Sequence, residues 1–234
     1  KRSHINFAAV LRVIGMLLTI EAFFMLVPLI TCIAYGEGDA QAFGITVAIT
    51  LVAGCALAFG LKPSNPDMGK RDGFLLTALV WVFFSLFGML PFMIGDAGMN
   101  MSDAFFEAMS GFTTTGASVI GSIDELSRGA VMWRSLMQWL GGMGIILFTL
   151  AVIPMLNHSG GMQMFNAEVT GITHDKLRPR ISQTAKGLWG IYCVLTVLLA
   201  ALLWVGPMDF YTALCYTFST ISTGGFTTTN SGLT

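Results

Sequence analysis

Long apolar segments alternate with short polar ones along most of this chain. Five apolar segments reach the length of about 20 residues that a membrane-spanning helix needs. They cover residues 7–34, 42–61, 73–94, 131–156 and 184–205. Because no alternating, strand-like pattern replaces them, the sequence predicts an all-α integral membrane protein.

Two further apolar segments are too short to cross a membrane. Residues 104–111 and 207–218 have the composition of short helices, and Ser102 or Asp103 is the expected N-cap of the first. Each is followed by a stretch rich in Thr and Gly, at residues 113–118 and 222–226, for which we expect an extended backbone. The pattern predicts two re-entrant pore loops, with a short helix leading in and an extended segment leading out.

The two pore-loop segments belong to an internal repeat. A shift of 109 positions places Ala104 on Ala213, Ser110 on Ser219 and Gly116 on Gly225. Each unit then consists of a span, a short helix and a Thr/Gly loop. Internal repeats are common in transport proteins, where the functional site lies at the interface between the repeats.

Charge is sparse, and its placement predicts an orientation. Only 11% of residues are charged, and 54% are hydrophobic, whereas soluble domains average about 25% charged residues. Ten of the twelve Lys and Arg residues lie on one side of the predicted spans, which the positive-inside rule assigns to the cytoplasm. Both Thr/Gly loops are then external, and acidic residues near them would attract cations: Asp96, Asp103, Asp124, Glu125 and Asp209.

Thr and Gly suit a cation pathway at this depth of the membrane. Non-helical backbone is tolerated there only where protein buries it or water reaches it, and its carbonyl oxygens can replace the hydration shell of K⁺. Gly116 and Gly225 can adopt backbone angles that a Cβ would penalise. The expected selectivity filter consists of Thr113, Thr114, Thr115, Gly116, Ala117, Ser222, Thr223, Gly224, Gly225 and Phe226. Potassium is expected at Thr114, Thr115, Gly116, Thr223, Gly224 and Gly225, without an organic cofactor.

Other polar and small residues in apolar segments have supporting roles in this interpretation. Glu21 is a functional candidate because it lies inside a span, and a contact with a neighbouring helix or with Arg12 is the alternative. We expect Glu107 to hold the first short helix through hydrogen bonds and Arg134 to extend toward the membrane surface. Gly141 and Gly142 would allow close backbone packing.

Cysteine and histidine add no site. Cys32, Cys55, Cys193 and Cys215 occur singly in apolar segments, where reduced, buried side chains are expected. The histidines His4, His158 and His174 are scattered, which argues against a metal centre. No nucleic-acid partner is indicated.

Two other functions compete with transport. Gly116-Ala117-Ser118 resembles the start of a Gly-x-Ser-x-Gly nucleophile motif, but Ile120 replaces the second Gly and no later span supplies a His base. An intramembrane hydrolase is therefore the weaker alternative, and we expect no enzyme activity. A non-conducting structural subunit is the other alternative. The sequence leaves open channel-like or ion-coupled transport, and K⁺ alone or K⁺ with Na⁺.

Five motifs resemble the Trk/Ktr/HKT superfamily of potassium and sodium transporters, with the bacterial TrkH type as the most similar branch. They occupy residues 103–107, 113–117, 139–144, 160–163 and 218–226. The resemblance implies four span–pore helix–span repeats around one pore, with one filter glycine in each. Gly116 and Gly225 match the first two glycines.

The resemblance also implies a division of the chain and a set of partners. Residues 1–69 would be an N-terminal pair of helices, 70–157 the first pore repeat, 158–182 a cytoplasmic linker, and 183–234 a second repeat that stops after its filter. The expected partners are two further repeats of the same transporter, a second copy in a homodimer, a cytoplasmic nucleotide-binding ring of the TrkA type, and lipid of the bacterial inner membrane.

Overall fold

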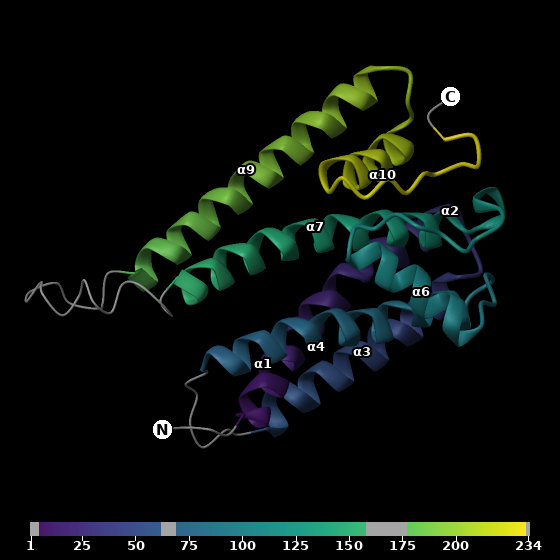
Figure 1. Ribbon diagram of the computed structural model, residues 1–234. Coiled ribbons are helices and arrows are strands. Elements are labelled where there is room, and N and C mark those ends of the chain that lie inside the picture. The colour runs from purple at the N-terminus through teal and green to yellow at the C-terminus, as the bar shows by residue number, and fades with distance from the viewer. Residues whose placement is uncertain (1–4, 62–68, 158–176, 233–234) are drawn as a thin grey trace, which may run out of the picture.

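The computed structural model describes residues 5–61, 69–157 and 177–232, and helices dominate these parts of the chain (Figure 1). No strand occurs in the described residues. The helices are α1 (Phe7–Phe24), α2 (Leu26–Tyr35), α3 (Ala40–Gly60), α4 (Lys70–Gly88), α5 (Leu90–Ile94), α6 (Met101–Phe112), the 3₁₀ turn η1 (Ile123–Glu125), α7 (Arg128–Asn157), α9 (Leu177–Val205) and α10 (Phe210–Ile221).

Four helical segments are long and apolar enough to cross a membrane, by length and composition, in the described part of the chain. They are Phe7–Tyr35, Ala40–Gly60, Arg71–Ile94 and Thr184–Val205. The 30-residue helix α7 occupies the place of the remaining expected span. Large apolar side chains on these helices are exposed, including Phe59 at 75% and Val205 at 85%, as expected for surfaces that contact lipid tails.

Proline interrupts two of the expected spans. The first span is divided into α1 and α2 at Met25, three residues before Pro28. The third span is divided into α4 and α5 at Met89, two residues before Pro91. Proline lacks the backbone N–H of the i→i−4 hydrogen bond, and its ring clashes with the carbonyl one turn earlier. The sequence therefore predicts four of its five spans correctly by length and composition, and it overestimates the regularity of two of them.

The internal repeat is present in the helix boundaries. Helix α6 covers Met101–Phe112 and α10 covers Phe210–Ile221, so both the first and last residues differ by 109 positions. The N-caps are Asn100 and Asp209, whose side chains accept hydrogen bonds from the N–H groups of Asp103 at 2.9 Å and Thr212 at 3.1 Å. The expectation of Ser102 or Asp103 as the first cap was wrong, because the helix begins at Met101.

Helix α7 lies between the two units and packs against both short helices (Figure 1). Trp133 on α7 is fully buried, donates its indole N–H to Gly88 at 2.9 Å and packs edge-on against Phe112 of α6. One and a half turns later, Trp139 contacts Phe218 of α10 and donates to Thr196 of α9 at 3.0 Å. The two tryptophans therefore fix α6 and α10 relative to one helix.

The loop between α2 and α3 ties the N-terminal helices to the first unit. The Glu37 carboxylate accepts hydrogen bonds from the N–H groups of Arg128 and Gly129 at the start of α7, at 2.9 and 3.2 Å. Asp39 accepts hydrogen bonds from Ser127 and from the N–H of Asp96. Carboxylates at a helix N-terminus pair with its unsatisfied N–H groups, so these contacts stabilise the start of α7.

Candidate ion pathway and its supports

The first Thr/Gly loop leaves α6 through a tight turn rather than through an extended segment. The N–H of Thr114 donates to Gly111 at 3.0 Å, and that of Thr115 donates to Ser110 at 2.9 Å. Thr114 has a φ of +56° and Gly116 a φ of +76°. The expectation of extended geometry throughout residues 113–118 was therefore wrong at its start, because Thr113 and Thr114 form the turn that ends the helix.

The second loop repeats this geometry. The N–H of Thr223 donates to Thr220 at 2.9 Å, and that of Gly224 donates to Ser219 at 2.8 Å. Thr223 has a φ of +56° and Gly225 a φ of +84°. A β-branched residue with positive φ is strained by about 1–3 kcal/mol. Its occurrence at the same place in both units indicates that the turn itself is required.

The turns leave a row of carbonyl oxygens without hydrogen bonds. No group in the described residues donates to the backbone carbonyl oxygens of six loop residues: Thr114, Thr115, Gly116, Thr223, Gly224 and Gly225. The Ala117 carbonyl, in contrast, accepts one from the Ser110 hydroxyl at 2.6 Å. Carbonyls without hydrogen bonds can bind a cation that reaches them, so these oxygens mark the candidate pathway, and that of Gly224 lies at the contact with Gly116.

The two loops are in direct contact. A Cβ added at Gly116 would lie 2.0 Å from the carbonyl oxygen of Gly224. A little further along the chain, the Ile123 N–H donates to Asn230 at 2.7 Å, and Asn230 donates to Ser122 at 3.2 Å. The structure therefore brings together the two stretches that the sequence singled out, although they are 109 residues apart.

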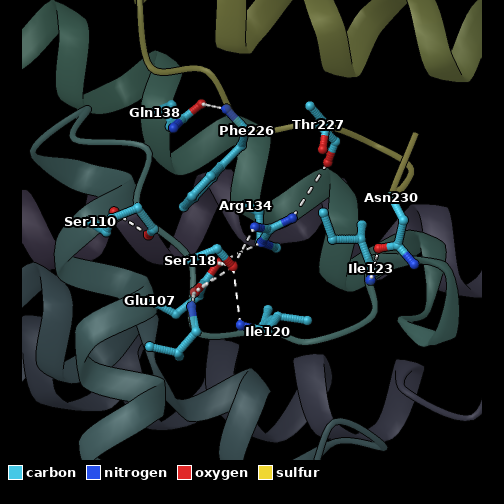
Figure 2. A network of polar contacts seen from close by, with 12 residues as sticks. Glu107, Ser110, Ser118, Ile120, Ile123, Arg134, Gln138, Phe226, Thr227 and Asn230 are labelled. Carbon is cyan, nitrogen blue, oxygen red and sulfur yellow. Dashed lines mark hydrogen bonds and ion pairs between the residues drawn. The ribbon is translucent and has the colours of Figure 1, made fainter. Parts of the chain in front are cut away.

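Behind the loops lies a buried polar network (Figure 2). Arg134 on α7 pairs with Glu107 on α6, with 2.7 Å between Nε and Oε1, and both side chains are at most 1% exposed. Glu107 also accepts hydrogen bonds from the Ser118 hydroxyl at 3.1 Å and from the Val119 N–H at 3.2 Å. The carboxylate therefore holds the end of the first loop, in agreement with its expected supporting role.

Arg134 has a different position from the one expected. The sequence suggested that it extends to the membrane surface, and this was wrong, because its guanidinium reaches both loops from a buried site. It donates to the Ser118 hydroxyl at 3.1 Å and to the Thr227 carbonyl at 3.4 Å, and it stacks on the Phe226 ring at 4.1 Å (Figure 2). Unsatisfied buried charge is costly, and Glu107 offsets it here.

The α7 glycines allow the backbone of the helix to touch both units. A Cβ at Gly141 would lie 1.8 Å from the carbonyl oxygen of Phe112, at the end of α6. A Cβ at Gly142 would lie 2.9 Å from the Cβ of Ser222, directly after α10. The expected close packing is therefore confirmed at the ends of the short helices, and Tyr192 of α9 also reaches this face, with its Oη 2.8 Å from a Cβ at Gly142.

An acidic pocket lies near both units, and two of the five acidic residues expected to attract cations, Asp124 and Asp209, line it. Its volume is about 610 Å³, and its lining includes Glu37, Asp124, Asp209 and Arg128. A hydrogen bond from the Thr212 side chain lowers the pKa of Asp209, so this carboxylate stays charged at neutral pH. Asp96, Asp103 and Glu125 do not line the pocket. The Asp96 N–H donates to Asp39, 57 positions earlier, and the Asp103 carboxylate accepts a hydrogen bond from the Asn100 amide.

The remaining candidates lie away from the loops or outside the described residues. Glu21 is 1% exposed and packs beside Gly88, and neither of its oxygens nor the Arg12 Nε has a hydrogen-bond partner in the described residues. All four cysteines are free, with Cys32 and Cys215 buried and the other two half-buried. His4, His158, His174 and the motif at 160–163 lie outside the described residues.

Gln138 is the polar residue that sequence reasoning missed. Its side chain is fully buried on α7, and its Oε1 accepts the N–H of Phe226 at 3.1 Å (Figure 2). The sequence did contain an indication of this role, because Gln138 is an amide inside an apolar span, four residues after Arg134. Polar residues in such segments usually contact a partner. Without the loop geometry, however, that partner could not be named.

Comparison with known proteins identifies the family from most of the chain. The profile described as "TrkH: Cation transport protein" matches residues 39–234. The chain belongs to this family. A transport family leaves little support for the hydrolase alternative, and Ser118, its candidate nucleophile, is hydrogen-bonded to Glu107 and Arg134.

Individual relatives agree with the family assignment. The Trk system potassium uptake protein TrkH of Vibrio parahaemolyticus is 40% identical over 225 residues, which are 95% of this chain and 46% of the relative. The protein of the same name from Halomonas elongata is 41% identical over 221 residues, which are 94% of this chain and 46% of the relative. The chain thus spans about half the length of the curated relatives it matches.

A solved TrkH structure has the same fold. The crystal structure of the potassium transporter TrkH from Vibrio parahaemolyticus matches with a TM-score of 0.82 at 36% identity, over 96% of this chain and 45% of that one. Together with the helices described above, this match confirms the expected all-α membrane architecture for the TrkH-like part.

Proposed function

We propose that this protein takes up potassium across the bacterial inner membrane through a pore whose filter includes both Thr/Gly loops. The ion contacts would be the carbonyl oxygens of Thr114, Thr115 and Gly116 in the first loop, and of Thr223, Gly224 and Gly225 in the second. The observation that supports this most strongly is that these oxygens accept no hydrogen bond from the described residues. Carbonyl oxygens held in this way can replace the hydration shell of K⁺.

Two loops cannot surround an ion by themselves, so the proposal includes further units. In a ring of four loops, each loop would contribute one side of the ion site. In this proposal the N-terminal helices occupy residues 1–69, the first repeat 70–157, the linker 158–182 and the second repeat 183–234. A second copy of the chain and a TrkA-type cytoplasmic ring complete the proposed assembly. The relatives named as potassium uptake proteins support the transported ion.

Rubidium uptake tests the proposal directly. The complete gene product is expressed in cells that lack other potassium transporters, and growth at low K⁺ is measured together with uptake of radioactive rubidium. We expect growth and uptake from the wild type, and lower discrimination of K⁺ over Na⁺ in Gly116→Ser, because the added side chain would displace Gly224.

Gly121→Ala is the matched control. A Cβ at Gly121 meets nothing within 4 Å, and this glycine lies five residues after Gly116 in the same external segment. It should transport as the wild type does. Absence of uptake by the wild type would instead favour a structural, non-conducting subunit, and unchanged discrimination in Gly116→Ser would contradict the filter assignment.

A further inference from the structure

Helix α7 places two polar side chains between the Thr/Gly loops, one helical turn apart. Arg134 is 1% exposed and Gln138 is not exposed at all. Residues four positions apart lie on the same face of a helix, and Figure 2 shows both side chains directed toward the loops. The proposed ion contacts are backbone carbonyls of the loops, so neither of these side chains is a candidate ion ligand.

The Arg134 guanidinium connects the two loops through separate nitrogen atoms. Its Nη2 donates to Ser118 at the end of the first loop, and its Nη1 donates to the carbonyl of Thr227 directly after the second. The Nε pairs with Glu107, which prevents the group from turning. A planar fork with several donors can hold such an arrangement, whereas the single ammonium of lysine cannot.

The Gln138 amide occupies the space between the glycines of the loops. Its Oε1 accepts the Phe226 N–H. A Cβ at Gly224 would lie 2.3 Å from the amide carbon of Gln138, and a Cβ at Gly116 would lie 3.8 Å from Nε2. Nε2 has no hydrogen-bond partner in the described residues. The amide thus lies against the backbone at Gly116, Gly224 and Phe226 without donating to any of the free carbonyls.

We propose that Arg134 and Gln138 are positioning residues that set the spacing of the two loops and thereby the ion selectivity of the pathway. The inference rests on the proposed transport function. Discrimination between K⁺ and Na⁺ depends on the size of the carbonyl cage and on the number of carbonyls that reach the ion. Carbonyls whose backbone is held from behind by buried, packed side chains keep that geometry, and loosening the support lets the cage contract around the smaller Na⁺.

Gln138→Met provides the first test, because methionine has a similar length and volume but offers no hydrogen bond to Phe226. The selectivity ratio is measured as inhibition of rubidium uptake by K⁺ relative to Na⁺, in the complete gene product. We expect this ratio to fall about fivefold, the factor that corresponds to one typical hydrogen bond. Ser135→Ala is the control, since Ser135 is buried on the same helix and its hydroxyl lies beside the Cys215 thiol rather than against either loop.

Arg134→Lys provides the second test and is informative even at reduced expression. Lysine keeps the positive charge opposite Glu107 but cannot contact both loops, so the selectivity ratio of K⁺ over Na⁺ should fall again. Ser135→Ala should keep the wild-type ratio. A purely structural role would lower K⁺ and Na⁺ transport in proportion and leave the ratio unchanged. An unchanged ratio in Gln138→Met, measured beside an active wild type, contradicts this inference alone. An inactive wild type contradicts the proposed function and this inference with it.

Discussion

In the first unit, the chain leaves α6 at Phe112 and turns through Thr114 and Gly116, and in the second it leaves α10 and turns through Thr223 and Gly225. The φ angle of the threonine is +56° in both, and the φ angles of the glycines differ by only 8°. The side chains around these turns differ far more. Backbone conformation is therefore the shared element, and each unit stabilises it by its own contacts.

The supports of the two units show this difference. Glu107 of α6, which is buried and paired with Arg134, has Tyr216 as its equivalent in α10. Tyr216 donates its hydroxyl to the carbonyl of Gly232 at 2.6 Å. Ser110 donates to Ala117, whereas its equivalent Ser219 has a hydroxyl without a partner in the described residues. The first unit is thus held by a buried charge pair, and the second by the neutral hydrogen bonds of Tyr216 and Gln138 together with one donor from Arg134.

The largest expected difference between the two units is in the free energy of unfolding, and it follows from removing the charge of Glu107. Glu107→Gln leaves the buried guanidinium of Arg134 without a counter-charge, which should destabilise the protein by about 3–5 kcal/mol. The matched variant Tyr216→Phe loses one neutral hydrogen bond, so its free energy of unfolding should fall by only about 1 kcal/mol. Thermal unfolding of the detergent-solubilised protein measures both. Equal losses would mean that the charge pair contributes no more than a neutral contact.

The positive-φ glycines of the two turns give the second comparison. Gly116→Ala combines a positive φ, which costs a residue with a Cβ about 1–2 kcal/mol, with a Cβ 2.0 Å from the Gly224 oxygen. Gly225→Ala has only the φ penalty, since nothing described lies within 4 Å of its Cβ. We therefore expect Gly116→Ala to reduce rubidium uptake more than Gly225→Ala does. The reverse order would show that contacts outside the described residues dominate at Gly225.

The spans, the short helices and the paired loops could all be predicted from the sequence. Their lengths are set by membrane thickness, and the repeat supplies two independent copies of the same local signal. The fold of the loops could be predicted less well, because the positive φ of Thr114 opposes the intrinsic preference of a β-branched residue and is imposed by the surrounding contacts.

The supports of the site were the least predictable part. Arg134 looks like a residue at the membrane surface when only neighbours in the sequence are considered, because its partners Glu107, Ser118 and Thr227 are 16 to 93 positions away. Gln138 similarly acquires its role from Phe226, 88 positions later. Burial of a charge inside a membrane protein requires such distant partners, and a single sequence does not reveal them.

The N-caps give the third comparison, in which the two units should respond almost equally at neutral pH. Asn100→Ala and Asp209→Ala each remove the acceptor for an N–H in the first turn of α6 or α10. Loss of such a cap costs about 1 kcal/mol. Thermal unfolding at pH 7 should therefore show two small decreases of similar size, and a much larger loss at either position would indicate a role beyond capping.

Acid separates these two caps, because only one of them titrates. The pKa of Asp209 is lowered in the folded protein, chiefly by the hydrogen bond from the Thr212 side chain. Its contribution is therefore fully present above the ordinary aspartate pKa of about 3.9 and is lost as the pH falls through the lower folded value. Asn100 carries no titratable group. We expect the stability difference between wild type and Asp209→Ala to shrink below pH 4. The difference between wild type and Asn100→Ala should change less, because there a carboxylate is only the acceptor of the Asn100 amide and not the cap itself. A parallel decrease in both differences would show that acid acts on the fold as a whole rather than on the cap of α10.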